Sequence, residues 1–314
     1  MIFANRAAGI LYWFLKAYPE GTYILPANIC PVVPLTFRKA GVEFEFLDIN
    51  PGNLCLDGQS VIDAIFASPN KYRGMVFVRT YGYLADMSDV FSQIKDIAPG
   101  FLIVDDRCLC FPDFSSQAEH TDLELYSTGY AKPIDLGYGG FAKTCHDIQF
   151  GQSIDFRPDS YKELEKIYKQ CLNERKPMHS YPQDWLDADI GNFKNVEYIR
   201  QIEESIIPMA EHKQRLNNYY SEHLPSDITL EEEFQNWRFN ILTDNKLEIL
   251  DAIFSKGLYA SSHYASSSIL FNKGEFPVTE QVSDRIINLF NDYNYTLEQA
   301  KATCGVICET LGQA

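Results

Sequence analysis

The sequence predicts an α/β protein with a mostly parallel central sheet, helices on both faces and a smaller α+β domain at the C-terminal end. In the first half, short apolar runs alternate with amphipathic stretches, a pattern typical of βαβ units. The alternation stops near residue 150. The chain has 314 residues, of which 46% are apolar, so it can form one large core and a smaller attached core.

The N-terminal elements follow from periodicity and from the residues that bound them. Residues 6–17 have helical spacing of apolar residues, 22–25 form a short run ended by Pro26, and 42–47 are β-rich after Gly41. The same criteria predict helices over 32–40, 59–67 and 86–97, and strands over 74–79, 101–104, 123–127 and 140–144.

The second half has a different pattern. Residues 151–192 are polar and contain three prolines, which indicates a loop-rich excursion. Beyond it we expect a long helix over 194–222, strands at 237–242 and 258–259, and helices over 245–255, 279–290 and 296–312. We therefore predict a large domain over 1–192 and a linking helix with a small domain over 193–314.

The charge of the chain excludes one class of partner. The formal net charge is −16, which repels nucleic-acid phosphates but leaves room for a locally positive site for a small anion. The apolar stretch 9–15 lacks the flanks of a signal peptide, and no run reaches the length of about 18 residues that a membrane span requires. We expect a cytoplasmic protein without membrane contact.

Eight cysteines are scattered along the chain. They are expected to be free thiols, since the chain is long and has no signal peptide. Neither the pair Cys108 and Cys110 nor the pair Cys304 and Cys308 has a partner pair or a His at zinc spacing. No metal site is predicted.

Candidate chemistry lies after the apolar strands. In a parallel sheet, ligands bind beyond the carboxyl ends of the strands. Asp105 and Asp106 end the run 101–104, and Ser127 and Lys132 follow 123–127. The chain contains no G-x-G-x-x-G between a strand and a helix, no phosphate-binding P-loop and no G-x-S-x-G.

A strand-end carboxylate with a lysine 26 positions later suits pyridoxal-phosphate (PLP) chemistry. The lysine holds the cofactor as a Schiff base and moves protons, and the carboxylate keeps the pyridine nitrogen protonated. Ser127 and N–H groups at a helix N-terminus, over residues 5–8, would hold the phosphate. By spacing alone, a solvated loop lysine and a capping carboxylate remain alternatives.

Several segments, in order, resemble the DegT/DnrJ/EryC1/StrS family of PLP-dependent sugar aminotransferases, which have fold-type I. The resemblance covers the chain with gaps from about residue 4 to the C-terminus. The segments that carry it are NRAA (5–8), ILPANICP (24–31), AG (40–41), FLD (46–48), RTYGYLADM (79–87), IVDD (103–106), YSTGYAK (126–132), GG (139–140), GLYASSHY (257–264) and FP (276–277).

The resemblance implies a role for each matching residue. Lys132 would form the Schiff base, Asp106 would pair with the pyridine nitrogen, and Ser127 with the backbone at Arg6 and Ala7 would bind the phosphate. His263 and Tyr264 would line the substrate site. Family members are homodimers with shared active sites, and transfer an amino group from glutamate to a keto-sugar nucleotide.

The chain departs from the family pattern at two cofactor-contact positions and one motif. Leu109 stands where Gln or His is common near the cofactor 3-hydroxyl, and Cys30 stands where an aromatic ring often stacks on the cofactor. The motif G-(Y/F)-N-x-R-M has no clear counterpart; the region 185–190 lacks its Asn and Arg. These departures motivate the alternative of a fold-type I homologue without transaminase turnover, kept for binding or regulation. A further alternative is a PLP-dependent lyase or decarboxylase.

Arg238 offers a second choice between function and structure. It follows Trp237 at the start of a predicted strand, where it could bind a substrate carboxylate or form a structural ion pair.

Overall fold

The larger sheet has seven strands. The computed structural model describes residues 1–191 and 194–312, and within them the strand order is β1-β7-β6-β5-β4-β2-β3. The five strands β2 to β6 are parallel, while β7 is antiparallel to β6 and β1 is antiparallel to β7. The predicted mostly parallel sheet is confirmed. In chain order the strands are β1 (Ile2–Ala4), β2 (Thr22–Pro26), β3 (Glu43–Leu47), β4 (Tyr72–Val78), β5 (Leu102–Asp106), β6 (Leu123–Ser127) and β7 (Gly140–Thr144).

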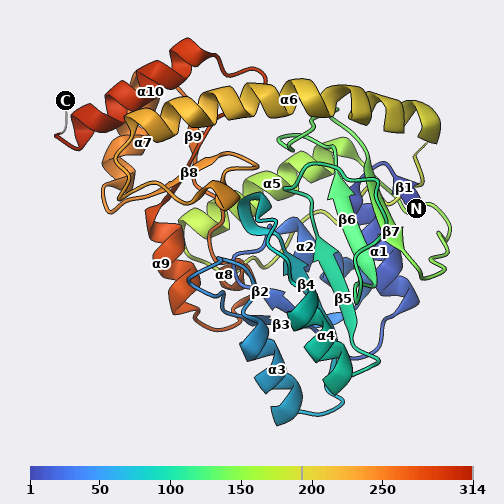
Figure 1. The fold of residues 1–314 in the computed structure, drawn as a ribbon. Helices are drawn as coiled ribbons and strands as arrows, with labels where there is room; N and C mark the ends of the chain where they lie inside the picture. The colour runs from blue at the N-terminus through green and yellow to red at the C-terminus, as the bar shows by residue number, and fades with distance from the viewer. Residues whose placement is uncertain (192–193, 313–314) are drawn as a thin grey trace.

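Helices cover both faces of this sheet (Figure 1). On one face, α1 (Ala7–Ala17) and α2 (Val32–Ala40) share the largest apolar core with alternate residues of the strands. On the other face, α3 (Gly58–Ala67) and α4 (Ser88–Ile97) pack over a second core. Strands covered on both faces explain the nearly continuous apolar runs in the sequence.

The C-terminal part forms a smaller α+β unit. Its antiparallel sheet has the order β8-β10-β9. The long helix α6 crosses from the β1 and β7 side of the large sheet to this unit (Figure 1). The other elements of this part are β8 (Phe239–Leu242), α7 (Lys246–Ser255), β9 (Ala260–Ser261), α8 (Ser268–Phe271), α9 (Pro277–Arg285), β10 (Ile286–Leu289) and α10 (Leu297–Thr310), with α6 spanning Asn195–His223 and short 3-10 turns at Thr80–Gly82 and Glu232–Phe234.

Three predicted elements differ from the structure. The strand expected at 258–259 lies two residues later, at Ala260–Ser261. The excursion over 151–192, expected to be loop-rich, contains the 16-residue helix α5 (Pro158–Asn173). The helix expected over 279–290 ends at Arg285, and the next four residues form the central strand β10. The predicted boundary between residues 192 and 193 lies outside the described residues.

The helices and the cysteines bear on membrane contact and on disulfide bonds. Among the residues described, no helix is long and apolar enough to cross a membrane. All eight cysteines lie in the described part of the chain and are free thiols there.

A buried lysine connects α6 to the small sheet. Lys213 is 4% exposed, and its Nζ donates to the backbone oxygen of Trp237 at 2.6 Å and to Asn291 Oδ1 at 2.8 Å. Burial is the main cause that lowers the pKa of Lys213 to about 7; the charge of Asp292 opposes it and that of Arg238 adds to it. The folded protein therefore loses the proton of Lys213 at a much lower pH than the unfolded chain does.

We expect the stability of the protein to rise with pH above about pH 7 through this group. Between the folded pKa and the unfolded value of about 10.4, the unfolded chain binds the extra proton, so the free energy of unfolding gains at most about 1.4 kcal/mol per pH unit. Lys213→Met should remove this part of the slope. Urea unfolding of both proteins from about pH 7 to about pH 9 checks it; equal slopes would contradict the assignment.

Candidate active site

Asp105 and Asp106 at the end of β5 face opposite sides of the sheet, because successive strand residues alternate. Asp105 is fully buried and Asp106 is 7% exposed. Asp106 accepts a hydrogen bond from the backbone N–H of Cys108 at 3.0 Å, and no ion pair among the described residues includes it. Asp106 is thus a buried carboxylate available to a ligand.

Lys132 lies in the loop after β6, and two contacts of the preceding residue hold this loop. Ala131 has a left-handed φ of 58°; its N–H donates to Asp135 Oδ2 at 2.8 Å, and its carbonyl accepts from Trp237 Nε1 at 2.7 Å. Lys132 itself is half-buried. A contact from the small domain therefore helps to position the lysine.

Asp106 ends β5 and Lys132 follows β6, and these two strands are parallel neighbours in the sheet. Burial raises the pKa of Asp106, against the hydrogen bonds from Cys108 and the charge of Lys132. Burial also raises the pKa of the Cys30 thiol, and the charge of Lys132 again opposes it. The charge of Lys132 therefore acts on both Asp106 and Cys30, which lie far from it in the sequence.

A candidate phosphate cradle lies at the N-terminus of α1. Arg6 is the extended N-cap residue; no side chain caps this terminus, and no acidic residue lies in the first turn. Ser127 Oγ accepts from the N–H of Gly129 at 3.3 Å. A side-chain carbon at Gly129 would lie 3.2 Å from Arg6 Nη1 and 3.5 Å from Ser127 Oγ, so the space between them is narrow.

Close packing brings the start of α1 to the sheet. A side-chain carbon at Gly140, the first residue of β7, would lie 2.4 Å from the backbone nitrogen of Ala7. Only glycine permits this approach. Because free N–H groups and the helix dipole favour an anion at a helix N-terminus, the backbone at Arg6 and Ala7 with Ser127 suits a phosphate.

His263 and Tyr264 approach the same site from the small domain. Tyr81 Oη donates to the carbonyl of His263 at 2.5 Å, and the His263 N–H donates to Asn288 Oδ1 at 2.7 Å. The ring nitrogen Nδ1 of His263 is buried without a hydrogen-bond partner among the described residues. Burial, followed by the charges of Arg238, Lys169 and Lys132, lowers the pKa of His263 to about 4. His263 is therefore neutral at pH 7.

Tyr264 and Leu109 have different surroundings. Burial raises the pKa of Tyr264, and the charges of Cys30 and Asp106 raise it further, so its hydroxyl belongs to the site. Leu109 is 4% exposed and packs in an apolar cluster with Tyr81 and Trp237. The position predicted to lie near the cofactor 3-hydroxyl thus contributes apolar packing.

Helix α5, which the sequence analysis missed, lies near Cys30. Tyr161 on this helix is 38% exposed at its surface, yet the burial of its hydroxyl end raises its pKa to about 12, and Cys30 and Arg6 are among the groups whose charges act on it. Cys30 likewise acts on Tyr168, which is buried with Leu164 on the inner side of α5. The signal was present: Leu164 and Tyr168 are four residues apart, and Pro158 starts the helix.

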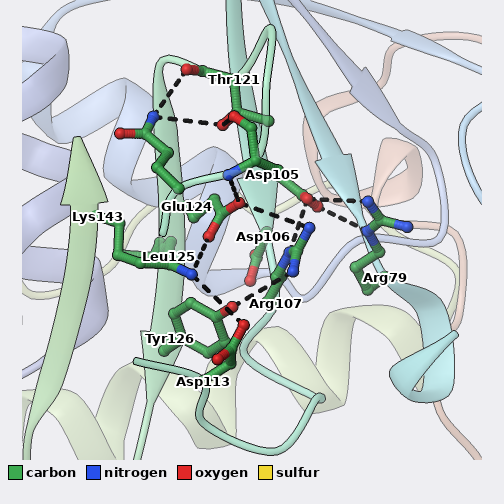
Figure 2. A network of polar contacts seen from close by, with 12 residues as sticks. Arg79, Asp105, Asp106, Arg107, Asp113, Thr121, Glu124, Leu125, Tyr126 and Lys143 are labelled. Carbon is green, nitrogen blue, oxygen red and sulfur yellow. Dashed lines mark hydrogen bonds and ion pairs between the residues drawn. The ribbon is translucent and has the colours of Figure 1, made fainter. Parts of the chain in front are cut away.

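A buried ionic network lies on the opposite face of β5 (Figure 2). Arg79 is 4% exposed and binds Asp105 through two hydrogen bonds of 2.8 and 2.9 Å. Arg107 Nε contacts the same carboxylate at 2.8 Å, and Lys143 pairs with Glu124 at 2.7 Å. The network satisfies Asp105 and holds the strand end that carries Asp106.

Arg79→Met is expected to destabilise the protein by about 3–5 kcal/mol, because it removes one partner of a buried ion pair. Urea unfolding measures the change. The matched control is Lys71→Met: Lys71 pairs with Glu45 at 2.7 Å, but the two side chains are 41% and 43% exposed. The control should cost at most about 1 kcal/mol. Equal losses in the two variants would show that the buried network does not stabilise the fold.

Comparisons with known proteins bear on the fold. No protein-family model and no curated protein sequence matches the chain. Among solved structures, the chain is similar to the sugar aminotransferase CalS13 from Micromonospora echinospora, with a TM-score of 0.71 and 14% identity over 98% of this chain and 86% of that chain.

Two further structures agree. A DegT DnrJ EryC1 StrS aminotransferase from Brucella abortus has a TM-score of 0.68 and 17% identity over 98% of this chain and 85% of that one. DesI, solved in the presence of its TDP-sugar product, has a TM-score of 0.72 and 15% identity over 99% and 81%. The predicted fold is confirmed: the chain has the fold-type I architecture of these aminotransferases.

Proposed function

We propose that the protein is a PLP-dependent aminotransferase that transfers an amino group, from glutamate, to a keto-sugar nucleotide or a similar ketone. The observation that carries the proposal is the juxtaposition of Lys132 with Asp106, a buried carboxylate without an ion-pair partner among the described residues. The fold supports it, since similar structures include sugar aminotransferases and one solved with a TDP-sugar product.

The residues present fit this cofactor. PLP carries a phosphate, a pyridine nitrogen and an aldehyde that reacts with a lysine, and when bound it withdraws electrons from the reacting carbon. The uncapped start of α1 with Ser127 fits the phosphate, and the buried Asp106 fits a protonated nitrogen. Cys30 supplies no aromatic ring, and Leu109 supplies no polar group, of the kinds common at their positions.

Each side chain then has a defined task. Lys132 would hold the cofactor and would move a proton at the α-carbon of the substrate. Asp106 would keep the pyridine nitrogen protonated, because a carboxylate stabilises the positive charge of the protonated nitrogen. His263 is neutral, so its buried Nδ1 can form a hydrogen bond with a substrate hydroxyl. Tyr264, the next residue, would line the substrate site beside it.

A homodimer is part of the proposal. Tyr130, two residues before Lys132, is 84% exposed, and Tyr259 in the small domain is 60% exposed. Exposed aromatic rings next to a site are typical of an interface, which supports a dimer in which a second copy of this chain covers them. Light scattering of the purified protein gives the mass in solution; a monomer at all concentrations would contradict this part.

The test of the function is a spectroscopic half-reaction. PLP added to the purified protein should produce a visible absorption band, and L-glutamate should then bleach the band while 2-oxoglutarate appears in equal amount. A band that does not respond to any amino donor would favour the homologue without turnover. Absence of a band at saturating PLP would overturn the cofactor assignment.

A further inference from the structure

Trp237, two residues before β8, contacts two strand-end segments of the large sheet. It is 4% exposed. Its backbone N–H donates to the carbonyl of Tyr81, after β4, at 3.2 Å, and its indole Nε1 donates to the carbonyl of Ala131, after β6, at 2.7 Å. The strand between β4 and β6 in the sheet is β5, which ends in Asp106. Trp237 therefore links the two segments that follow the neighbours of this strand.

Both acceptor residues have a backbone conformation that side chains disfavour. The φ angle is 56° at Tyr81 and 58° at Ala131. A left-handed φ is uncommon for residues other than glycine and is an outlier for a bulky side chain, so it persists only where the surroundings hold it. Such positions cluster at functional sites. The two hydrogen bonds from Trp237 hold these positions, because each fixes the carbonyl of one of the two residues.

Ring contacts and a buried lysine keep the indole in place. The Trp237 ring stacks on the Tyr81 ring at 6.4 Å with an interplanar angle of 9°, and on the Tyr264 ring at 6.2 Å with an angle of 16°. From α6, Lys213 Nζ donates to the carbonyl of Trp237 at 2.6 Å. The indole is therefore held from several sides, so its N–H can fix the carbonyl of Ala131.

We propose that Trp237 is a positioning residue for Lys132, an inference that rests on the proposed aminotransferase function. The carbonyl that the indole binds belongs to the peptide group that includes the nitrogen and Cα of Lys132, and this group is planar. Fixing the carbonyl therefore fixes the Cα from which the lysine side chain starts. Proton transfer depends steeply on where the amino group lies. This role needs no contact of Trp237 with cofactor or substrate, because it acts through the loop backbone.

Hydrogen–deuterium exchange of the cofactor-free protein tests the contact itself. Trp237→Phe keeps an aromatic ring and removes the indole N–H. Amides over 129–136 should then exchange about 2- to 12-fold faster, the loss expected for one hydrogen bond, because the loop opens more easily. Amides of β5 should not change. Unchanged exchange over 129–136, or equal acceleration in β5, would overturn the proposal.

Trp13→Phe is the matched control. Trp13 lies in α1 and is 9% exposed, and its Nε1 donates to the carbonyl of Ala188 at 2.7 Å. The control therefore loses the same kind of buried hydrogen bond at another place, and exchange over 129–136 should change by less than about twofold. Equal acceleration over 129–136 in the two tryptophan variants would overturn the proposal.

Lys213→Met serves if Trp237→Phe fails to fold. It removes the hydrogen bond to the carbonyl of Trp237 and leaves the indole present. Exchange over 129–136 should then rise at least about twofold, since the indole is held less firmly. No rise in this variant would overturn the proposal.

The glutamate half-reaction separates positioning from binding. In the PLP-loaded protein, Trp237→Phe should lower the limiting rate by about 10- to 100-fold, the larger value being the cost of a displacement of about 1 Å. The half-saturating glutamate concentration should stay the same, because no donor contact is removed. An unchanged limiting rate, or a change confined to the half-saturating concentration, would overturn the proposal.

The two measurements also separate this inference from the proposed function. Exchange is measured without cofactor, so it shows whether Trp237 holds the loop in any case. A wild type that glutamate does not bleach would overturn the proposed function, and with it the role assigned to the loop. A wild type that is bleached, with a Trp237→Phe protein that is bleached equally fast, would overturn this inference alone.

Discussion

Lys132→Ala is expected to abolish the visible absorption band of the PLP-loaded protein and to lower turnover by at least about 10²–10⁴-fold, the contribution of a positioned proton-transfer group. In the proposed function Lys132 combines the covalent hold on the cofactor with the proton transfer, so a single change would remove both. The position of the loop is fixed by contacts of the Ala131 backbone. The substitution at residue 132 leaves these contacts in place. The fold should therefore survive.

Absorption spectra and glutamate half-reaction rates measure the effect. Lys162→Ala is the control, because Lys162 lies on α5 with 75% exposure and pairs only with the exposed Asp159 among the described residues. It should keep both the band and the rate. A Lys132→Ala protein that retained the covalent band would show that another lysine carries the cofactor.

Asp106→Asn is expected to lower turnover by about 10²–10³-fold, the scale found when one preorganised electrostatic partner is removed. The amide can still accept the hydrogen bond from Cys108, but it cannot hold a proton on the pyridine nitrogen by charge. PLP binding should weaken as well. Glutamate half-reaction rates and PLP titrations measure the two effects.

The same substitution should stabilise the protein when PLP is absent. Burial raises the pKa of Asp106 above its unfolded value, so the folded state binds the proton more tightly. Stability is therefore lost as pH rises through the interval above the unfolded pKa, so the ionised carboxylate destabilises the folded protein. Asparagine has no charge to bury and removes this destabilisation.

Asp105→Asn, at the neighbouring residue, is expected to destabilise the protein, whereas Asp106→Asn is expected to stabilise it. Asp105 is fully buried with Arg79 and Arg107. Loss of its charge leaves Arg79 without its carboxylate and Arg107 with Glu124 at 3.6 Å, at a cost of about 3–5 kcal/mol. Urea unfolding in the absence of PLP compares the two variants. Equal destabilisation by both would contradict the different roles assigned to the two carboxylates.

The large sheet was predictable because its strands are buried on both faces and its helices are amphipathic. The apolar run 101–104 ending in two aspartates located the strand end, and the order of motifs located Lys132 and Ser127. Their juxtaposition follows from the parallel topology, which brings the ends of β5 and β6 to one edge.

The missed elements depend on tertiary contacts. β10 follows α9 without a break in the apolar pattern, and its pairing with β8 and β9 overrides the helical periodicity. β1 has three residues and pairs with β7, far away in the chain. Its sequence gives no local signal. The choice for Arg238 was open because its partners, Phe290 and Ser261, come from distant segments.

If Lys132 carries PLP in a working active site, borohydride reduction of the PLP-loaded protein fixes the cofactor to it. Proteolysis and mass analysis of the peptides then locate the label. We expect a phosphopyridoxyl group on the peptide that contains Lys132, and none when the protein has been treated with L-glutamate before reduction. A label on another lysine, or no label at saturating PLP, would contradict it.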